Sequence, residues 1–337
     1  MTRATKRPPR KAPASPAAVA SSASAEGDVP SAPTRCGTVA IVGRPNVGKS
    51  TLLNAILGQK IAATTHKPQT TRRAIRGFET RGSAQIVFVD TPGLHQSRGK
   101  LHAFMIDEAM NAARGVDVLA FVVEAHKKGV HREDERALEQ LEQWGALKVP
   151  VVLVVNKIDT LDDKKLLLPF LDAWSKTNRF AALIPVSSSK KDGVDLLVSD
   201  LMARMPEGPF LFDKDAVTDA TEREIAAELI REKVMLELQQ ELPYRAAVVV
   251  EEVDESRRDD ATKPLVHIGA VIHVERDSQK AMVIGKGGIR IKTIGERARK
   301  ELERLLGCQV MLQLLVRVEP DWTTTEKGLA KLGYTKR

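Results

Sequence analysis

The stretch Gly43-Arg44-Pro45-Asn46-Val47-Gly48-Lys49-Ser50 decides the fold of the first half of the chain. An apolar run at 38–42 precedes it and predicts a buried strand, and residues 51–57 follow it with the apolar pattern of a helix. A GxxxxGKS loop between a strand and a helix is a P-loop, in which backbone N–H groups and the positive end of the helix surround a phosphate. We predict that Lys49 contacts the β- and γ-phosphates and that the Ser50 hydroxyl binds Mg²⁺. The predicted nucleotide contacts here are Gly43, Arg44, Pro45, Asn46, Val47, Gly48, Lys49, Ser50 and Thr51.

Residues 37–206 alternate apolar runs with helical patterns. The apolar runs lie at 38–42, 85–89, 118–123, 151–155 and 181–186, and the helical patterns at 51–57, 100–113, 132–144, 163–176 and 194–205. This alternation predicts an α/β domain with a mainly parallel sheet and helices on both faces. Residues 73–80 are expected to add an edge strand. Ligands of such sheets bind at the carboxyl ends of the strands, where the remaining motifs lie.

Residues Asp90, Thr91, Pro92 and Gly93 directly follow the apolar run 85–89. An aspartate at this strand end is placed to hold Mg²⁺, usually through a water molecule. Gly93 can offer its N–H to a γ-phosphate, because it has no Cβ to block the approach. The alternative is an ordinary strand-ending turn, since Asp, Pro and Gly all favour turns.

The polar segment Gln69-Thr70-Thr71-Arg72 lies between the P-loop and Asp90. A threonine hydroxyl here could bind Mg²⁺ only when a γ-phosphate orders the loop, which makes a nucleotide-dependent switch. Thr71 is the first choice for this ligand and Thr70 is the alternative. Two threonines that merely start a strand are the structural alternative.

The tetrapeptide Asn156-Lys157-Ile158-Asp159 follows the run 151–155 and selects the base. A carboxylate at Asp159 accepts hydrogen bonds from N1–H and the 2-amino group of guanine, whereas adenine lacks that donor pair. Asn156 can bond the base edge and connect loops, and the Lys157 stem can cover the ring. Backbone N–H groups of Ser187 and Ser188 are expected to reach the guanine carbonyl.

The second half of the chain has a different pattern. Residues 207–219 lack a period and are expected to be a linker, and 220–337 follow the order α-β-β-α-α-β with a GxxG loop. Such a loop lets RNA phosphates approach the backbone at a helix N-terminus. The predicted RNA contacts are Gly285, Lys286, Gly287, Gly288, Arg290 and Lys292. The alternative is a helix-turn-helix with a solvated charged face. Trp322 and Tyr334 are expected to pin a last helix rather than to stack on bases.

The motifs GRPNVGKS, PQTTR, DTPGLH and NKID, in this order and spacing, resemble those of Era-type GTPases. The similarity extends to the second half, which resembles a type II KH domain, and covers all but the N-terminal tail. It implies a Ras-like G domain that binds GTP and GDP, and a KH domain that engages the 3′ end of 16S rRNA and assists 30S subunit assembly. The alternative is a membrane-associated regulatory GTPase whose basic face meets anionic lipid. Ser187-Ser188 stands where many relatives have Ser-Ala.

The predicted catalytic groups are Lys49, Asn46, Thr71 and Gly93. Leu94 stands where a glutamine could orient the attacking water, and without an arginine finger we expect hydrolysis at or below ~10⁻² s⁻¹. Related GTPases with a hydrophobic residue here use a P-loop asparagine to hold K⁺, and Asn46 occupies that place. The alternative for Asn46 is a turn-forming residue.

Composition limits the class of protein and its cellular location. The chain has 337 residues, a net charge of +8 and no apolar run near the ~18 residues of a membrane span. Cys36 and Cys308 have no metal-ligand spacing and suggest a reducing compartment. Residues 1–36 are rich in Pro, Ala and Ser and are expected to be a disordered basic tail. They lack the apolar core of a signal peptide, and their prolines argue against a transit peptide. We therefore expect a cytoplasmic monomer, with peripheral contact with the inner membrane as an option and an organellar source disfavoured.

Overall fold

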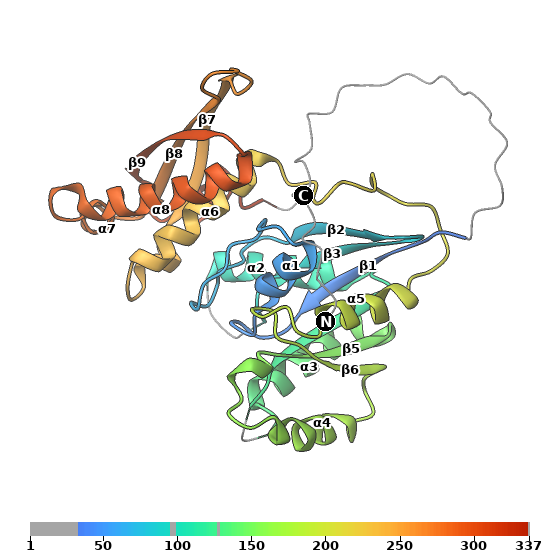
Figure 1. The fold of residues 1–337 in the computed structure, drawn as a ribbon. Coiled ribbons are helices and arrows are strands. Elements are labelled where there is room, and N and C mark those ends of the chain that lie inside the picture. The colour runs from blue at the N-terminus through green and yellow to red at the C-terminus, as the bar shows by residue number, and fades with distance from the viewer. Residues whose placement is uncertain (1–32, 95–98, 127–128, 336–337) are drawn as a thin grey trace.

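The computed structural model describes residues 33–94, 99–126 and 129–335 and contains two lobes (Figure 1). The strands of the N-terminal lobe are β1 (Arg35–Val42), β2 (Ile75–Arg81), β3 (Ala84–Asp90), β4 (Val118–Glu124), β5 (Val151–Asn156) and β6 (Ala182–Pro185). Its helices are α1 (Lys49–Leu57), α2 (Lys100–Ala113), α3 (Arg132–Gln143), α4 (Leu167–Ser175) and α5 (Val194–Ala203). Short 3₁₀ turns lie at Ala146–Lys148, Ile158–Thr160 and Lys164–Leu166.

The N-terminal sheet has the order β2-β3-β1-β4-β5-β6. Strand β2 is antiparallel to β3 at one edge, and the other neighbouring strands are parallel. One apolar core packs α1 and α5 against the sheet and continues into the C-terminal lobe, and a second core packs α2, α3 and α4 against the other face. The predicted mainly parallel α/β fold is therefore confirmed, and the P-loop lies at the carboxyl end of β1, in the middle of the sheet.

The C-terminal lobe contains α6 (Glu222–Glu237), β7 (Ala247–Arg257), β8 (Leu265–Val274), α7 (Asp277–Ile284), α8 (Ile289–Leu306), β9 (Gln309–Val318) and α9 (Glu326–Lys331). Short 3₁₀ turns lie at Leu242–Arg245 and Lys286–Gly288. The sheet order is β7-β8-β9, with β7 antiparallel and β9 parallel to the central β8. Up to β9, this is the predicted order α-β-β-α-α-β. The three longer helices α6, α7 and α8 gather on one side of this sheet in Figure 1.

The first strand begins earlier than predicted, at Arg35 rather than at residue 38. Arg35 and Cys36 pair with β3, and the Arg35 N–H donates to Ser83 O at 2.9 Å. Neighbouring segments therefore satisfy the polar backbone of Arg35 and Cys36, a pairing that the composition of this region does not predict. Residues 1–32 of the predicted tail lie outside the described residues.

The segment 207–219, which lacks helices and strands, is held along the edge of the N-terminal sheet. The buried Gln85 amide accepts from Leu211 N at 2.9 Å and from Phe212 N at 3.1 Å, and donates to Phe212 O at 2.8 Å. The Phe212 ring stacks on Phe78 with centroids 3.7 Å apart. The segment is therefore a fastened connection rather than a free linker.

Helix α6 is buried on more than one side. Its predicted apolar positions Ile225 and Leu229 are buried, yet the charged residues Arg231, Glu232 and Lys233 are only 1%, 2% and 6% exposed. The helix packs on α8 and β7 of its own lobe, and its charged side faces loops of the N-terminal lobe. Among the described residues, no helix is both long enough and apolar enough to cross a membrane.

The C-terminal segment joins both lobes through an apolar cluster of α2, β7 and the chain end. Its buried members are Leu101, Phe104, Met105, Ala247, Trp322, Leu329, Leu332 and Tyr334. Trp322 is fully buried, stacks on Tyr334 at 5.6 Å, and donates its Nε1–H to Arg245 O at 3.0 Å. Trp322 therefore pins the chain end, and its ring is not exposed for stacking on a base.

Candidate functional site

The P-loop wraps closely around the Lys49 side chain. Gly43 has a φ of 147°, and a Cβ placed there would lie 2.3 Å from Val122 O, so only glycine fits. Lys49 is 6% exposed, and its Nζ donates to Gly43 O at 3.1 Å and to Arg44 O at 3.0 Å. Burial lowers the pKa of this ammonium to about 8, although attraction by Asp90 opposes the shift. The carbonyls thus hold Lys49 in the loop, where it can meet a phosphate.

Three oxygen-bearing side chains meet beside the P-loop. The Ser50 Oγ lies 2.6 Å from Asp90 Oδ2 and 2.8 Å from Thr71 Oγ1, and Thr71 Oγ1 lies 3.3 Å from the same Asp90 oxygen. Mg²⁺ takes hard oxygen ligands at about 2.0–2.1 Å, so neighbouring ligands of its octahedron are roughly 2.9 Å apart. The separation of 2.8 Å between the Ser50 and Thr71 hydroxyl oxygens is close to that spacing, whereas Asp90 is hydrogen-bonded to both hydroxyls, as suits an aspartate that meets Mg²⁺ through a water molecule. The buried Asp90 Oδ1 has no hydrogen-bond partner, and burial raises the pKa of Asp90 to about 6.

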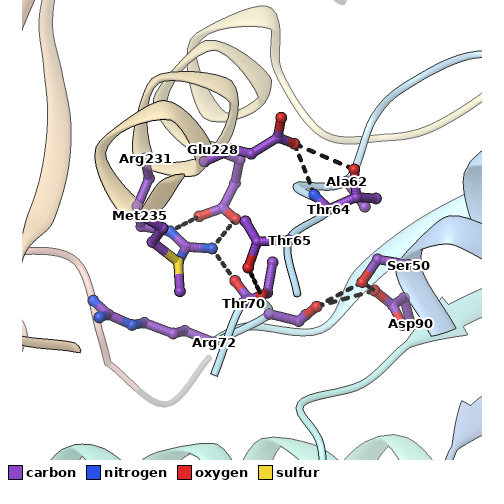
Figure 2. Close-up of polar contacts among 12 residues, drawn as sticks. Ser50, Ala62, Thr64, Thr65, Thr70, Arg72, Asp90, Glu228, Arg231 and Met235 are labelled. Atoms are coloured by element: carbon purple, nitrogen blue, oxygen red, sulfur yellow. Dashed lines mark hydrogen bonds and ion pairs between the residues drawn. The ribbon is translucent and has the colours of Figure 1, made fainter. Parts of the chain in front are cut away.

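Thr71 and Thr70 point to different places in the switch loop, which we define as residues 64–72. Thr71 is buried and joins Ser50 and Asp90. The Thr70 hydroxyl instead bonds Thr65 Oγ1 at 2.7 Å, as Figure 2 shows. It also bonds Lys67 O at 2.7 Å. The switch loop and the P-loop line an open pocket. Its lining residues are Pro45, Asn46, Gly48, Lys49, Ser50, Thr51, Ala63, Thr64, Thr65, Gln69, Thr70, Thr71 and Gly93.

Asn156 connects the three loops around the expected base site. Its Nδ2 donates to Val47 O at 2.8 Å, and its Oδ1 accepts from Ser188 N at 3.1 Å and Ser188 Oγ at 2.8 Å. The Ser187 N–H donates to Asp192 O at 2.8 Å. The predicted N–H groups of both serines are therefore engaged with protein acceptors, and a bond to a guanine carbonyl requires one of them to open.

Asp159 lies exposed at the start of the loop after β5, oriented by two serines. Its Oδ1 accepts from Ser187 Oγ at 2.6 Å and its Oδ2 from Ser189 Oγ at 3.1 Å. The bond from Ser187 is the main cause that lowers the pKa of Asp159, so the group is an ionised acceptor. Lys157 adopts a left-handed φ of 61°, and its Nζ lies 3.1 Å from Glu124 Oε2.

Two acidic residues that the sequence did not single out hold Arg44. Its Nε lies 2.9 Å from Asp134 Oδ1 on α3, and its Nη2 lies 3.3 Å from Glu124 Oε2 at the end of β4. Asp134 is fully buried, and this burial raises its pKa to about 7 while Arg44 opposes the shift. The sequence shows that the first turn of α3 is acidic, but it does not show which residue these acids contact.

The remaining predicted residues differ in exposure. Leu94 is 3% exposed and packs into the apolar core, and its N–H donates to Gly43 O at 3.1 Å. Its side chain is therefore turned away from water. Gly93 touches the P-loop, because a Cβ there would lie 2.8 Å from Pro45 Cα. Asn46 is exposed at the pocket with a left-handed φ of 65°. His95 lies outside the described residues.

The GxxG loop lies between α7 and α8 at the surface of the C-terminal lobe. Gly287 and Gly288 have φ values of 61° and 76°, which L-residues rarely adopt. Lys286 is exposed, while Arg290 folds back and donates to Met282 O. Lys292 is exposed on the first turn of α8. The loop thus presents backbone and the exposed Lys286 at a helix N-terminus, as a phosphate clamp requires.

Comparisons with known proteins agree with this geometry. Residues 38–157 match a family described as 50S ribosome-binding GTPase, and residues 241–323 match the KH domain. The GTPase Era of Geobacter metallireducens is 47% identical over 303 residues, which cover 90% of this chain and 99% of the relative. The GTPase Era of Xylella fastidiosa is 45% identical over 303 residues, covering 90% and 98%.

Two solved structures match almost the whole fold at 37% identity. A crystal structure of Era in complex with MgGDPNP and nucleotides 1506-1542 of 16S ribosomal RNA has a TM-score of 0.82, over 90% of this chain and 100% of that chain. A variant of Aquifex aeolicus Era bound to GDP.AlF4- has a TM-score of 0.83 with the same coverage. Similarity of this extent, in sequence and in structure, shows that the chain belongs to the Era family of GTPases.

Proposed function

We propose that this GTPase is a nucleotide-dependent switch that binds 16S rRNA near its 3′ end and assists 30S subunit assembly as a cytoplasmic monomer. The observation that carries the proposal is the match, over nearly the whole chain, to an Era structure that contains nucleotides 1506-1542 of 16S rRNA. The exposed Lys286 and the left-handed Gly287 and Gly288 support it, because they suit the clamping of RNA phosphates.

The test is a charge reversal in the GxxG loop. Lys286→Asp combined with Gly287→Asp places carboxylates where phosphates approach, so we expect at least tenfold weaker binding to an RNA of the 1506-1542 sequence. GTP affinity should stay unchanged, because the loop lies in the other lobe. Lys327→Asp, an exposed reversal on α9, is the control.

Two further outcomes separate the alternatives. In cell lysates, the protein should sediment with small-subunit precursors, and co-sedimentation with 50S particles alone would contradict the proposal. Anionic phosphatidylglycerol vesicles should not compete with the RNA. Full competition by vesicles, with RNA affinity unchanged in the GxxG variant, would favour the membrane reading instead.

We also propose that Ser50, Thr71 and Asp90 hold Mg²⁺ with the nucleotide. The three oxygens within 2.6–3.3 Å of one another and the unpartnered Asp90 Oδ1 support this set. When bound, Mg²⁺ would neutralise charge at the β- and γ-phosphates, and Lys49 and the P-loop N–H groups would orient these phosphates. Asp159, Asn156 and the serine loop, which we define as residues 187–189, give selectivity for guanine.

K⁺ is proposed as a second cation at the phosphates, held partly by Asn46. Two features support it: the exposed Asn46 amide borders the phosphate pocket, and Leu94 is buried and cannot orient water. GTP hydrolysis should be faster in KCl than in NaCl at equal ionic strength. Asn46→Gly keeps the left-handed φ and removes the amide, so it should abolish the difference while GDP binding persists. Equal rates of the unaltered protein in both salts would exclude this role.

A further inference from the structure

Helix α6 of the C-terminal lobe holds the switch loop at three points. Glu232 Oε2 accepts from Thr64 N at 2.7 Å, and Arg231 Nη2 donates to Thr70 O. At the C-terminal end of the helix, Lys67 Nζ donates to Met235 O at 2.5 Å and to Leu238 O, two carbonyls left open by the ending helix. Figure 2 shows Arg231 reaching from the helix toward Thr70.

The contacts come from one face of α6, because residues 228, 231, 232, 235 and 238 recur at helical spacing. Both charged groups are pre-oriented. Glu228 binds Arg231 through two oxygens, at 3.0 Å to Nε and 2.5 Å to Nη2. The other oxygen of Glu232 is held by Lys60 at 2.7 Å and Lys233 at 2.6 Å. A buried charge that is fixed by partners outside the switch loop offers the loop a rigid hydrogen-bonding template.

Thr71 is fixed from both sides by the C-terminal lobe. Before it, the Thr70 carbonyl is bound by Arg231. After it, the buried Arg72 donates to Ala246 O at 2.8 Å and Tyr244 O at 2.9 Å, and its guanidinium lies 5.6 Å from the Trp322 ring centroid. The backbone at residue 71 is therefore placed by contacts that involve neither nucleotide nor metal.

We propose that Arg231 and Glu232 are positioning residues for the GTP-bound site. They template the switch loop so that the Thr71 hydroxyl meets Ser50 and Asp90 before the γ-phosphate and its metal bind. Ordering a loop of nine residues costs backbone conformational entropy. A loop that α6 already orders avoids part of that cost when GTP binds. The inference rests on the assignment of Thr71 to the Mg²⁺ site in the proposed function.

GDP lacks the γ-phosphate that recruits a switch-loop threonine, so the template should matter for the triphosphate alone. In the full chain, Arg231→Met removes the donor to Thr70 and keeps an unbranched side chain beside Met235. We expect about tenfold weaker binding of the Mg²⁺ complex of GDPNP, the effect of losing one charge-assisted hydrogen bond. GDP affinity should change by less than about twofold. Both constants are measured by competition with a fluorescent guanine nucleotide.

The matched control is Arg223→Met on the same helix, whose guanidinium bonds Val250 O and Glu251 O, away from the switch loop. It should change neither affinity. Lys67→Met is the second variant. It removes the donor through which the switch loop binds the carbonyls at the end of α6, and the position is partly exposed. This variant therefore tests the proposal if Arg231→Met does not fold. Equal losses for GDPNP and GDP, or no loss for either, would overturn the proposal. If Thr71→Ala leaves GDPNP binding unchanged while Arg231→Met weakens it, the error lies in the assignment of Thr71 rather than in the template.

Discussion

At the scale of single residues, the proposed base site depends on a few oriented side chains. Asp159 is exposed to a ligand but held by Ser187 and Ser189, and Asn156 is buried and joins the P-loop to the serine loop. A hydrogen-bonding site of this kind discriminates strongly, because a wrong partner leaves polar groups unpaired.

Asp159→Asn should therefore change the base preference. An amide replaces one acceptor oxygen by an NH₂ group, which faces the 2-amino group of guanine donor to donor. GTP affinity should fall about 100-fold or more. Binding of xanthosine triphosphate should appear, because its 2-oxo group accepts a hydrogen bond. Competition binding measures both, with Asp163→Asn as the control, and an unchanged preference for GTP would contradict the role of Asp159.

Asp134 should make stability depend on pH. Burial raises its pKa to about 7, so the folded chain holds this proton more tightly than the unfolded chain, where the carboxyl titrates near 3.8. This group therefore favours folding at low pH, and its contribution is lost as pH rises through about 7.

In Asp134→Asn this loss of folding stability with rising pH should be absent. Between pH 5 and pH 7.5 the free energy of unfolding should decline by about 2 kcal/mol less than in the unaltered chain, from ~1.4 kcal/mol per pKa unit. Urea unfolding at both pH values measures the difference. Parallel pH profiles of the two proteins would show that Asp134 does not titrate in this range.

At the scale of elements, the switch loop and α6 form one structural unit although they are about 160 residues apart in sequence, as the Arg231 contact with Thr70 illustrates. Within this unit neighbouring threonines have different partners. Thr71 faces Ser50 and Asp90, and Thr70 closes a turn with Thr65 and Lys67.

Thr71→Ala and Thr70→Ala should consequently differ. Loss of the Thr71 hydroxyl removes one proposed metal ligand, so the gain in GDPNP affinity on adding Mg²⁺ should shrink about tenfold, a change of ~1.4 kcal/mol. Thr70→Ala should alter it less than threefold, since only a local turn is weakened. Titration of Mg²⁺ against fixed nucleotide distinguishes the two, and the reverse order would assign the ligand to Thr70.

At the scale of the whole molecule, the chain end fastens the two lobes together. Trp322 and Tyr334 lie in one cluster with α2 of the N-terminal lobe and β7 of the C-terminal lobe, and Arg72 lies over both rings. The two lobes are also joined by Lys60, which reaches Glu232 on α6 and Glu301 on α8 at 2.7 Å and 2.8 Å.

Trp322→Ala should uncouple the lobes. Truncating a fully buried tryptophan costs about 3–5 kcal/mol, and here the lost packing lies between the lobes. Calorimetry should show one unfolding transition for the unaltered chain and two for the variant. The control is Trp174→Ala within the N-terminal lobe, which should lower the transition temperature without splitting it. A single transition in Trp322→Ala would mean that other contacts couple the lobes.

The sequence by itself determined the parts that are local in the chain. The P-loop, Asp90, the Asn156–Asp159 motif and the GxxG loop each place their functional groups within a few residues of a strand end or helix start, and the apolar runs between them predict the sheet. Short motifs of this kind carry their geometry with them, because backbone turns and helix starts depend on adjacent residues.

Only the tertiary structure decided which distant groups hold those motifs. Arg231 and Glu232 look like the solvated side of an amphipathic helix, and Asp134 looks like an ordinary first-turn acid, yet all three are buried against loops from elsewhere in the chain. The different partners of the neighbouring threonines likewise show only in the folded chain, where Thr71 meets Ser50 and Asp90 and Thr70 meets Thr65 and Lys67. A charged residue shows its type in the sequence but not its partner, since the partner is set by how the lobes pack, and packing is a long-range property of the fold.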